Sequence, residues 1–449
     1  MNLPNYFLAD LPPEASVGPA MLVEACQALK RNRERYLAGR TTQDLIRSLA
    51  EVGEAWLRPD YPLRALALEK GPAATGFSRA TLAAGLDSFF KELSAERLLA
   101  LVEQDLGHAH ALDEMTRFER GRSAIAIGPE FLVHIAAGNL PNPTLASIVL
   151  GLLAKSAQFV KCAAGTSFLP RLFAHSIYEA EPKLGACIEI AQWHGGNQPL
   201  EEVLFAEADC VTATGTDETL ATIRQYVPIK KRFLGYGHRV SFGFITNRVL
   251  STRHAPKVAS QAASDIAAWN QLGCLSPHLL YVQPGGEISP ERFAEMLADE
   301  LERREQTEPR GELPVKAAAV IATRRAFYEV RAAHSPGTRL WHSRNSTAWT
   351  VVFEADPRFQ VSCLNRFVYV KAVADLAGAL HSAAAVQGQV STVGLAASEE
   401  QARELATELA HWGVTRVCQL GRMQQPPLTW RHDGRPALGD LVTWTDWET

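Results

Sequence analysis

The sequence lacks any closely spaced pair of cysteines, although its 449 residues include seven of them. An odd number of widely spaced cysteines argues against a disulfide framework and against a zinc site built from paired cysteines. We therefore expect free thiols, no bound metal and a reducing compartment, the cytoplasm.

The chain also lacks a long apolar run and a large excess of charge of either sign. Its longest apolar run, about residues 146–153, is too short to span a bilayer. The N-terminus has no basic region followed by an apolar core, so we expect no signal peptide. The formal net charge is −4, which gives no reason to expect binding to nucleic acid or to an anionic membrane.

The chain does contain two regions with different patterns of apolar residues. Residues 16–105 carry apolar side chains at helical spacing and predict a helical N-terminal region. Short apolar runs then alternate with helical segments, which predicts an α/β fold with a mostly parallel sheet. Ligands of such sheets bind beyond the carboxyl ends of the strands. That rule places Asn139, Lys161 and Gly215 on one rim, after expected strands at 131–137, 158–162 and 210–215.

Later segments predict further strands at 279–282, 347–353, 367–370 and 392–394, with helices between them. We expect a helical region and nucleotide-binding domain over residues 1–245 and a catalytic domain over 246–390. A C-terminal segment, 391–449, would return to the first lobe or form a subunit contact.

Cys274 stands between an expected helix, 256–270, and the strand at 279–282. The preceding Gly273 lets a backbone or a ligand approach closely. A thiol at such a junction can be exposed in a cleft while its flanks stay packed, as a covalent nucleophile requires. A small buried hydrophobic side chain is the alternative role.

Other candidate residues each have two interpretations. The Asn139 amide could donate to an oxyanion or stabilise a turn. Lys161 could bind a nucleotide ribose or phosphate, or lie on the surface. Gly215 and Thr216 could hold a pyrophosphate at a helix N-terminus, or only cap that helix. His238 could act as an acid or base, or hydrogen-bond a backbone carbonyl.

Together, these motifs resemble the aldehyde dehydrogenase superfamily, and within it the acyl-CoA reductases of bacterial bioluminescence, the LuxC type. The resemblance implies two Rossmann-like lobes with a cleft between them. It also implies Cys274 as nucleophile, Asn139 as oxyanion donor, and Lys161, Gly215 and Thr216 as nucleotide contacts. The segments that carry it are Gly138-Asn139-Leu140-Pro141, Phe159-Val160-Lys161, Gly215-Thr216-Asp217-Glu218-Thr219, Tyr236-Gly237-His238-Arg239-Val240-Ser241-Phe242, Gln271-Leu272-Gly273-Cys274-Leu275-Ser276-Pro277 and residues 421–435.

Three departures from the aldehyde-oxidising pattern carry information. The glutamate that activates the hydrolytic water is missing, because residues 237–241 contain no carboxylate. No glutamate follows Lys161 at position 164, so nothing there would repel the 2′-phosphate of NADPH. The segment 362–367 stands where those enzymes carry Glu-x-Phe-Gly-Pro, which leaves the contacts to the nicotinamide ribose open.

The resemblance and these departures predict an NADPH-dependent reductase that converts an acyl thioester to an aldehyde through a cysteine-bound acyl-enzyme. The donor would be acyl-CoA or an acyl-carrier, with a possible acyl-transferring partner protein, and the enzyme would form a homo-oligomer. His238 would protonate an oxyanion or a leaving thiolate. Two alternatives are a non-redox acyl-binding or acyl-transfer component and an acyl-phosphate reductase.

Overall fold

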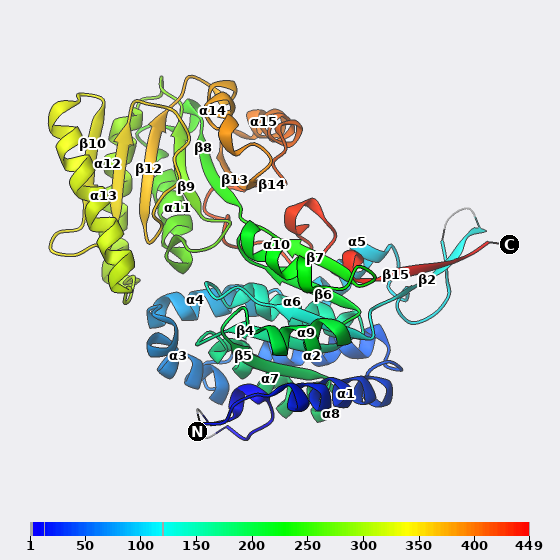
Figure 1. Ribbon diagram of the computed structural model, residues 1–449. Helices are drawn as coiled ribbons and strands as arrows, with labels where there is room; N and C mark the ends of the chain where they lie inside the picture. Colours follow the sequence, from blue (N-terminus) through cyan, green and yellow to red (C-terminus); the bar gives the residue numbers. More distant parts are fainter. Residues whose placement is uncertain (1–2, 13, 119–120, 449) are drawn as a thin grey trace.

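A computed structural model describes residues 3–12, 14–118 and 121–448. Figure 1 shows two lobes, one formed by the N-terminal half of the chain and one by most of the remainder. The last segment, drawn in red, runs back from the second lobe along the first. Within the described ranges, no helix is both long and apolar enough to cross a membrane.

The first lobe is organised on a five-stranded parallel sheet with the order β5-β4-β3-β6-β7. Its inner strands are almost entirely buried, as expected for a parallel sheet covered on both faces. The strands are β3 (Phe131–Ile135), β4 (Ala157–Ala163), β5 (Ile188–Trp193), β6 (Cys210–Thr214) and β7 (Arg232–Tyr236). The helices between them are α6 (Asn142–Leu153), α7 (Phe168–Ala180), α8 (Pro182–Gly185), α9 (Gln198–Glu207) and α10 (Asp217–Tyr226).

The helical N-terminal region packs against this sheet and its helices. Three of its helices begin at side-chain caps, because Thr41, Ser78 and Ser94 each accept a hydrogen bond from a backbone N–H three residues on. Trp56 stacks on Phe90 with ring centroids 4.6 Å apart, inside the core shared with α6 and α7. The helices are α1 (Pro19–Tyr36), α2 (Thr42–Leu57), α3 (Pro62–Thr75), α4 (Arg79–Phe90) and α5 (Ala95–Leu106).

The second lobe is organised on a seven-stranded sheet with the order β10-β11-β12-β9-β8-β13-β14. Only the edge strand β10 is antiparallel to its neighbour. The strands are β8 (Val240–Ile245), β9 (Pro277–Val282), β10 (Thr338–His342), β11 (Thr350–Glu354), β12 (Phe367–Ala372), β13 (Val390–Ala396) and β14 (Arg416–Gln419). The helices are α11 (Ala255–Ala267), α12 (Pro290–Thr307), α13 (Val315–His334), α14 (Leu376–Ser382) and α15 (Glu399–Trp412).

Sheet membership bears on the expected division of the chain. Strand β8 precedes residue 246 yet belongs to the second sheet, and β13 and β14 follow residue 390 yet belong to it too. We therefore place the boundary between the lobes at residues 237–239, and the start of the returning C-terminal segment at residue 420.

A small third sheet has the order β1-β2-β15 and is antiparallel. It joins β1 (Thr116–Arg117) and β2 (Ser123–Ile127) to β15 (Thr443–Trp447) near the C-terminus. Figure 1 shows β2 and β15 extending away from the first lobe. The last strand of the chain therefore pairs with a strand from the N-terminal half of the chain.

Candidate active site

Cys274 lies in the loop that joins α11 to β9 and is half-buried. The three residues Trp269, Asn270 and Gln271 have left-handed backbones, with φ of 51°, 52° and 64°. Side chains other than glycine rarely adopt this region, and three in succession store strain that the surroundings must offset. The chain is thus forced into a sharp turn just before the cysteine.

Trp269 anchors this turn to the first lobe. Its indole lies against α4, where a Cβ added at Gly85 would come within 2.0 Å of the ring atom Cζ2. It also meets Phe77 edge-on, with ring centroids 5.1 Å apart. Only glycine at position 85 leaves room for this contact, so the contact positions the cysteine loop relative to α4.

Two buried amides fix the rest of the turn. Asn270 Nδ2 donates to the Arg310 carbonyl at 2.7 Å. Gln271 Nε2 donates to the carbonyls of Pro277 and Phe367, at 2.7 and 2.9 Å. These bonds satisfy the donor groups of the two amides, and those of Gln271 tie the loop to β9 and β12.

The hydroxyl of Ser241 on β8 holds the cysteine backbone itself. It donates to the Cys274 carbonyl at 2.7 Å and accepts from the backbone N–H of Thr392 at 3.1 Å. Ser276 N–H donates to the Gly273 carbonyl at 2.9 Å, which closes a tight turn around Cys274. The position of the thiol is therefore fixed by bonds on both sides.

Asn139, in the loop between β3 and α6, is brought to this turn. Its Nδ2 donates to the Leu272 carbonyl at 2.9 Å. A Cβ added at Gly273 would lie 3.1 Å from Leu140 Cδ1 and 3.0 Å from Gln424 Oε1, so both side chains pack closely on this glycine. The structure thus places the amide of Asn139 within two residues of the thiol.

A cavity of about 90 Å³ adjoins Asn139 at the carboxyl ends of β3 and β4. It has room for a small group but not for a whole dinucleotide. Its lining includes Gly138, Asn139, Leu140, Cys162 and Thr166.

Burial raises the pKa of Cys274 to about 11, and the nearby Asp433 carboxylate raises it further. Hydrogen bonds from the backbone and the Arg239 guanidinium act in the opposite direction. Because the pKa lies far above 7, Cys274 is a thiol at neutral pH in this structure. The expected attack by a thiolate therefore requires a change in its surroundings.

Asp433 introduces a carboxylate that the sequence pattern did not indicate. It lies on the returning C-terminal segment, and its Oδ1 accepts from Arg239 Nε at 3.1 Å. Residues 237–241 themselves contain no carboxylate, as noted above, but the fold supplies one from almost 200 residues further along the chain.

His238 lies between β7 and β8 with its side chain exposed to solvent. Its backbone N–H donates to Asp217 Oδ1 at 3.0 Å. Burial lowers the pKa of His278 on β9 to about 4, and the charge of His238 adds to that shift. His238 thus influences a buried histidine of β9, and its role in proton transfer stays a prediction.

Lys161 is buried at the carboxyl end of β4, next to the cavity. Its Nζ lies 5.7 Å from the centroid of the Trp193 ring and, within the described ranges, makes no hydrogen bond or ion pair. Burial lowers the pKa of this amine, and Glu201 opposes that shift. An amine on a largely buried lysine, with no bond to a described residue, is free to contact a ribose or phosphate group of a nucleotide.

Gly215 and Thr216 stand between β6 and α10. The Thr216 hydroxyl caps the helix by accepting from Thr219 N–H at 3.3 Å. Asp217 and Glu218 occupy the first turn, where they already interact favourably with the helix dipole. The structure therefore confirms a cap at this position, and a pyrophosphate there would meet two carboxylates.

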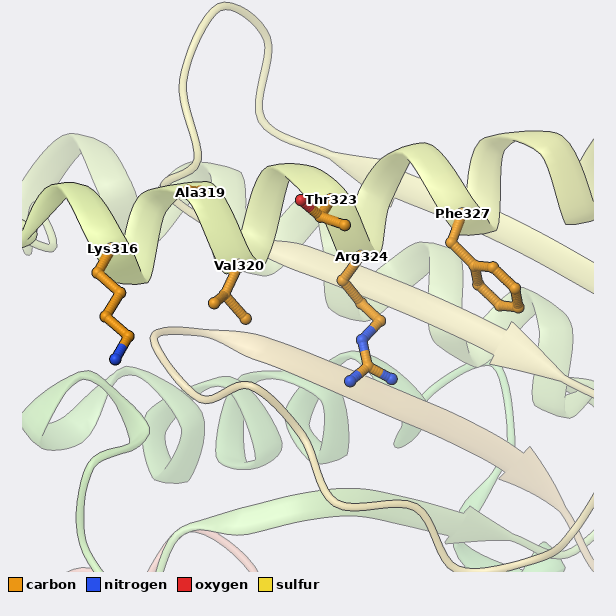
Figure 2. Close-up of a pocket in the computed structure, with 6 residues that line it drawn as sticks. All are labelled: Lys316, Ala319, Val320, Thr323, Arg324 and Phe327. Atoms are coloured by element: carbon orange, nitrogen blue, oxygen red, sulfur yellow. The ribbon is translucent and has the colours of Figure 1, made fainter.

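A larger groove of about 510 Å³ runs along one face of α13. Figure 2 shows its lining side chains pointing from the helix to the same side. Lys316 and Arg324 form no ion pair with any described residue, and Phe327 is 54% exposed. The groove is lined by Lys316, Ala319, Val320, Thr323, Arg324 and Phe327.

In the part of the chain that the structure describes, no cluster of three His, Cys, Asp or Glu side chains could hold a metal ion.

Among the predicted site residues, the structure brings Asn139 to the Cys274 loop. It places Lys161, Gly215 and Thr216 at the edge of the first sheet. No role was predicted for Ser241, Gln424, Arg239 or Asp433, although all four lie in segments that carry the family resemblance.

Comparison with known families gives a match over nearly the whole chain. The family described as "Acyl-CoA reductase (LuxC)" matches residues 37–444. A long-chain acyl-protein thioester reductase of Aliivibrio fischeri is 25% identical over 90% of this chain and 82% of its own length. A second enzyme of that name, from Photobacterium leiognathi, is 25% identical over 95% of this chain and 85% of its own length.

Solved structures show the fold independently. A benzaldehyde dehydrogenase of Corynebacterium glutamicum superposes with a TM-score of 0.70 at 13% identity, over 97% of this chain and 91% of that one. A Δ-pyrroline-5-carboxylate dehydrogenase of Mycobacterium tuberculosis gives 0.69 at 12% identity, over 96% and 83%. The aldehyde dehydrogenase fold predicted from the motifs is therefore confirmed.

Proposed function

The chain belongs to the LuxC family of acyl-CoA reductases, and on that premise we propose that it reduces a long-chain acyl thioester to the aldehyde through an acyl-enzyme on Cys274. The observation that carries the proposal is the hydrogen bond from the Asn139 amide to the Leu272 carbonyl, two residues before Cys274. The Ser241 hydroxyl holds the backbone of Cys274 itself. The donor would be acyl-CoA or an acylated protein, as the names of the relatives indicate.

The chain's own residues account for acyl transfer as follows. The Cys274 sulfur bonds to the thioester carbonyl carbon, the carbon–sulfur bond to the carrier breaks, and the carrier leaves as a thiol. Asn139 Nδ2 has two hydrogens; one is used by the Leu272 carbonyl, and the other is available to the oxyanion. His238 would supply a proton to the oxyanion or to the leaving thiolate.

The nucleotide would bind along the carboxyl edge of the first sheet, where Lys161 offers a buried amine. When bound, NADPH supplies a hydride to the acyl carbon. Cys274 then leaves from the resulting thiohemiacetal as the aldehyde departs. Asn139 stabilises the alkoxide at this step as well, because the charge develops on the same oxygen.

A stoichiometric experiment tests the proposal. Incubation with a panel of acyl-CoAs, without nucleotide, should leave one acyl group on the peptide that contains Cys274, detected by mass spectrometry. Addition of NADPH should release one aldehyde per acyl group and remove the adduct. An adduct that persists after NADPH is added would instead favour a non-redox acyl-transfer component. Acylation from acyl phosphates but not from acyl-CoAs would favour an acyl-phosphate reductase.

The choice of nucleotide can be tested at Ala164, an exposed residue three positions after Lys161. Ala164→Glu should weaken NADPH binding roughly tenfold or more and improve the preference for NADH, because the carboxylate repels a 2′-phosphate and can accept from ribose hydroxyls. Fluorescence titration with both nucleotides measures the change. Ala164→Gln, of the same size without the charge, is the control. If Ala164→Glu and Ala164→Gln weakened NADPH binding equally, the result would contradict the proposal.

We place the enzyme in the cytoplasm and expect it to assemble with itself. All seven cysteines are free thiols, which suits a reducing compartment. Strand β15 is exposed along its whole length, and Trp447, at its end, is 57% exposed. An exposed apolar strand at a sheet edge favours pairing with a second copy. An acyl-transferring protein would be a transient partner.

A further inference from the structure

The C-terminal segment from residue 420 to 435 packs directly on the cysteine loop. The backbone N–H groups of Gly421 and Met423 donate to Asp265 on α11. Gln424 Nε2 donates to the Ser276 hydroxyl, and its carboxamide lies against Gly273. This segment therefore forms one wall of the surroundings of Cys274.

The same segment is also fastened to the first lobe. Glu92 accepts from the Leu428 N–H at 3.2 Å, and Gln104 Nε2 donates to the Thr429 carbonyl at 2.8 Å. His432 stacks on Tyr236 at the end of β7, with ring centroids 4.6 Å apart. Both lobes thus hold the segment, which fixes the position of its next residue, Asp433.

Asp433 is held in an unusual conformation and is nearly buried. Its φ is 54°, and its side chain is only 7% exposed. Oδ1 accepts from Arg239, whereas Oδ2 is buried and, within the described ranges, has no hydrogen-bond partner. A buried carboxylate oxygen without a partner is costly, so its retention in a strained turn indicates a use.

Arg239 comes from the opposite wall. It stands two residues before Ser241, whose hydroxyl holds the Cys274 carbonyl. We infer that Arg239, just before β8, and Asp433, on the C-terminal segment, are positioning residues that together control the reactivity of the Cys274 thiol. In this role the C-terminal segment supplies a carboxylate, Asp433, that β8 lacks. The positive charge of Arg239 partly offsets the effect of that carboxylate on the thiol.

The electrostatics agree with this arrangement. The Asp433 carboxylate raises the pKa of Cys274 and Arg239 lowers it. The two charges of the pair therefore oppose each other, and burial is the main cause that keeps the sulfur protonated. The other charged or titratable groups around the pair and the thiol are Arg416 on β14, His278 on β9, Asp265 on α11, His238, Tyr236, His432 and Arg435.

The experiment measures alkylation of Cys274 by iodoacetamide between pH 6 and 10, peptide by peptide. Asp433→Asn should speed the reaction at pH 8 at least about threefold, because a lower pKa gives more thiolate. Arg239→Gln should slow it at least about threefold. Opposite changes from the two halves of one ion pair are not expected of a merely structural contact.

Two controls separate charge from loosening. Asp440→Asn removes a carboxylate from the same segment, one that pairs with Arg435 instead, and should leave the rate at Cys274 unchanged. Cys363 is half-buried with a pKa raised to about 11 by burial, and its rate should be the same in all variants. Changes of one sign in both variants, no change in either, or an equal change at Cys363 would overturn the inference.

This inference rests on the proposed function in one respect, the assignment of Cys274 as the nucleophile. Alkylation needs neither a thioester nor a nucleotide, so it gives an answer even if no acyl-enzyme forms. Where acyl-enzyme does form, the pH dependence of its formation should move to lower pH in Asp433→Asn and to higher pH in Arg239→Gln.

Discussion

Cys274→Ala is expected to abolish aldehyde formation, by about a thousandfold or more, while nucleotide binding stays within twofold of the native value. The sulfur forms the only covalent bond to the acyl group in the proposed mechanism, and removal of a catalytic nucleophile typically costs several orders of magnitude. Aldehyde release from acyl-CoA and NADPH measures the first quantity, and nucleotide fluorescence measures the second.

The matched control is Cys418→Ala. Cys418 is also half-buried, and burial also raises its pKa to about 11, but it lies on β14 rather than at the turn held by Asn139 and Ser241. Its replacement should change turnover less than about threefold, an ordinary result for a substitution outside the site. Residual turnover of a tenth or more in Cys274→Ala would remove that sulfur from the mechanism.

The strands of the first sheet could be predicted because each is a buried run bounded by turn residues. β3, β4 and β6 fall within a few residues of the predicted ranges. Local pattern alone identifies such strands, since both faces of a parallel sheet are covered and the run is apolar throughout. The same reasoning placed Asn139 and Lys161 on one rim.

Strands that depend on distant partners could not be found in this way. β2 alternates small side chains, and β15 is exposed on both faces; their pairing joins Ile127 to Thr443. Nothing in the local sequence indicates such contacts, because they form only when both lobes are in place.

The surroundings of the thiol show the same limit. Its place at a helix-to-strand turn followed from sequence, but its protonation did not. The pKa of Cys274 depends first on burial and then on Asp433, which reaches the site only through the returning segment. A single sequence gives the spacing of Arg239 and Asp433 along the chain, not the 3.1 Å between their side-chain atoms.

Asn139→Ala should lower kcat about a hundredfold to a thousandfold with little change in KM, because an oxyanion donor acts mainly in the transition state. The native amide also donates to the Leu272 carbonyl, so its loss should cost about 1 kcal/mol of stability as well. Steady-state kinetics and thermal unfolding measure the two effects separately.

Asn142→Ala is the matched control, because Asn142 Nδ2 likewise donates to one carbonyl, that of Gly85, at 3.1 Å. Both variants should lose similar stability, but only Asn139→Ala should lose kcat. Asn139→Asp keeps the shape and removes the donor, and it should be at least as slow because its charge opposes the oxyanion. If Asn142→Ala slowed turnover equally, Asn139 would be holding the loop rather than the oxygen.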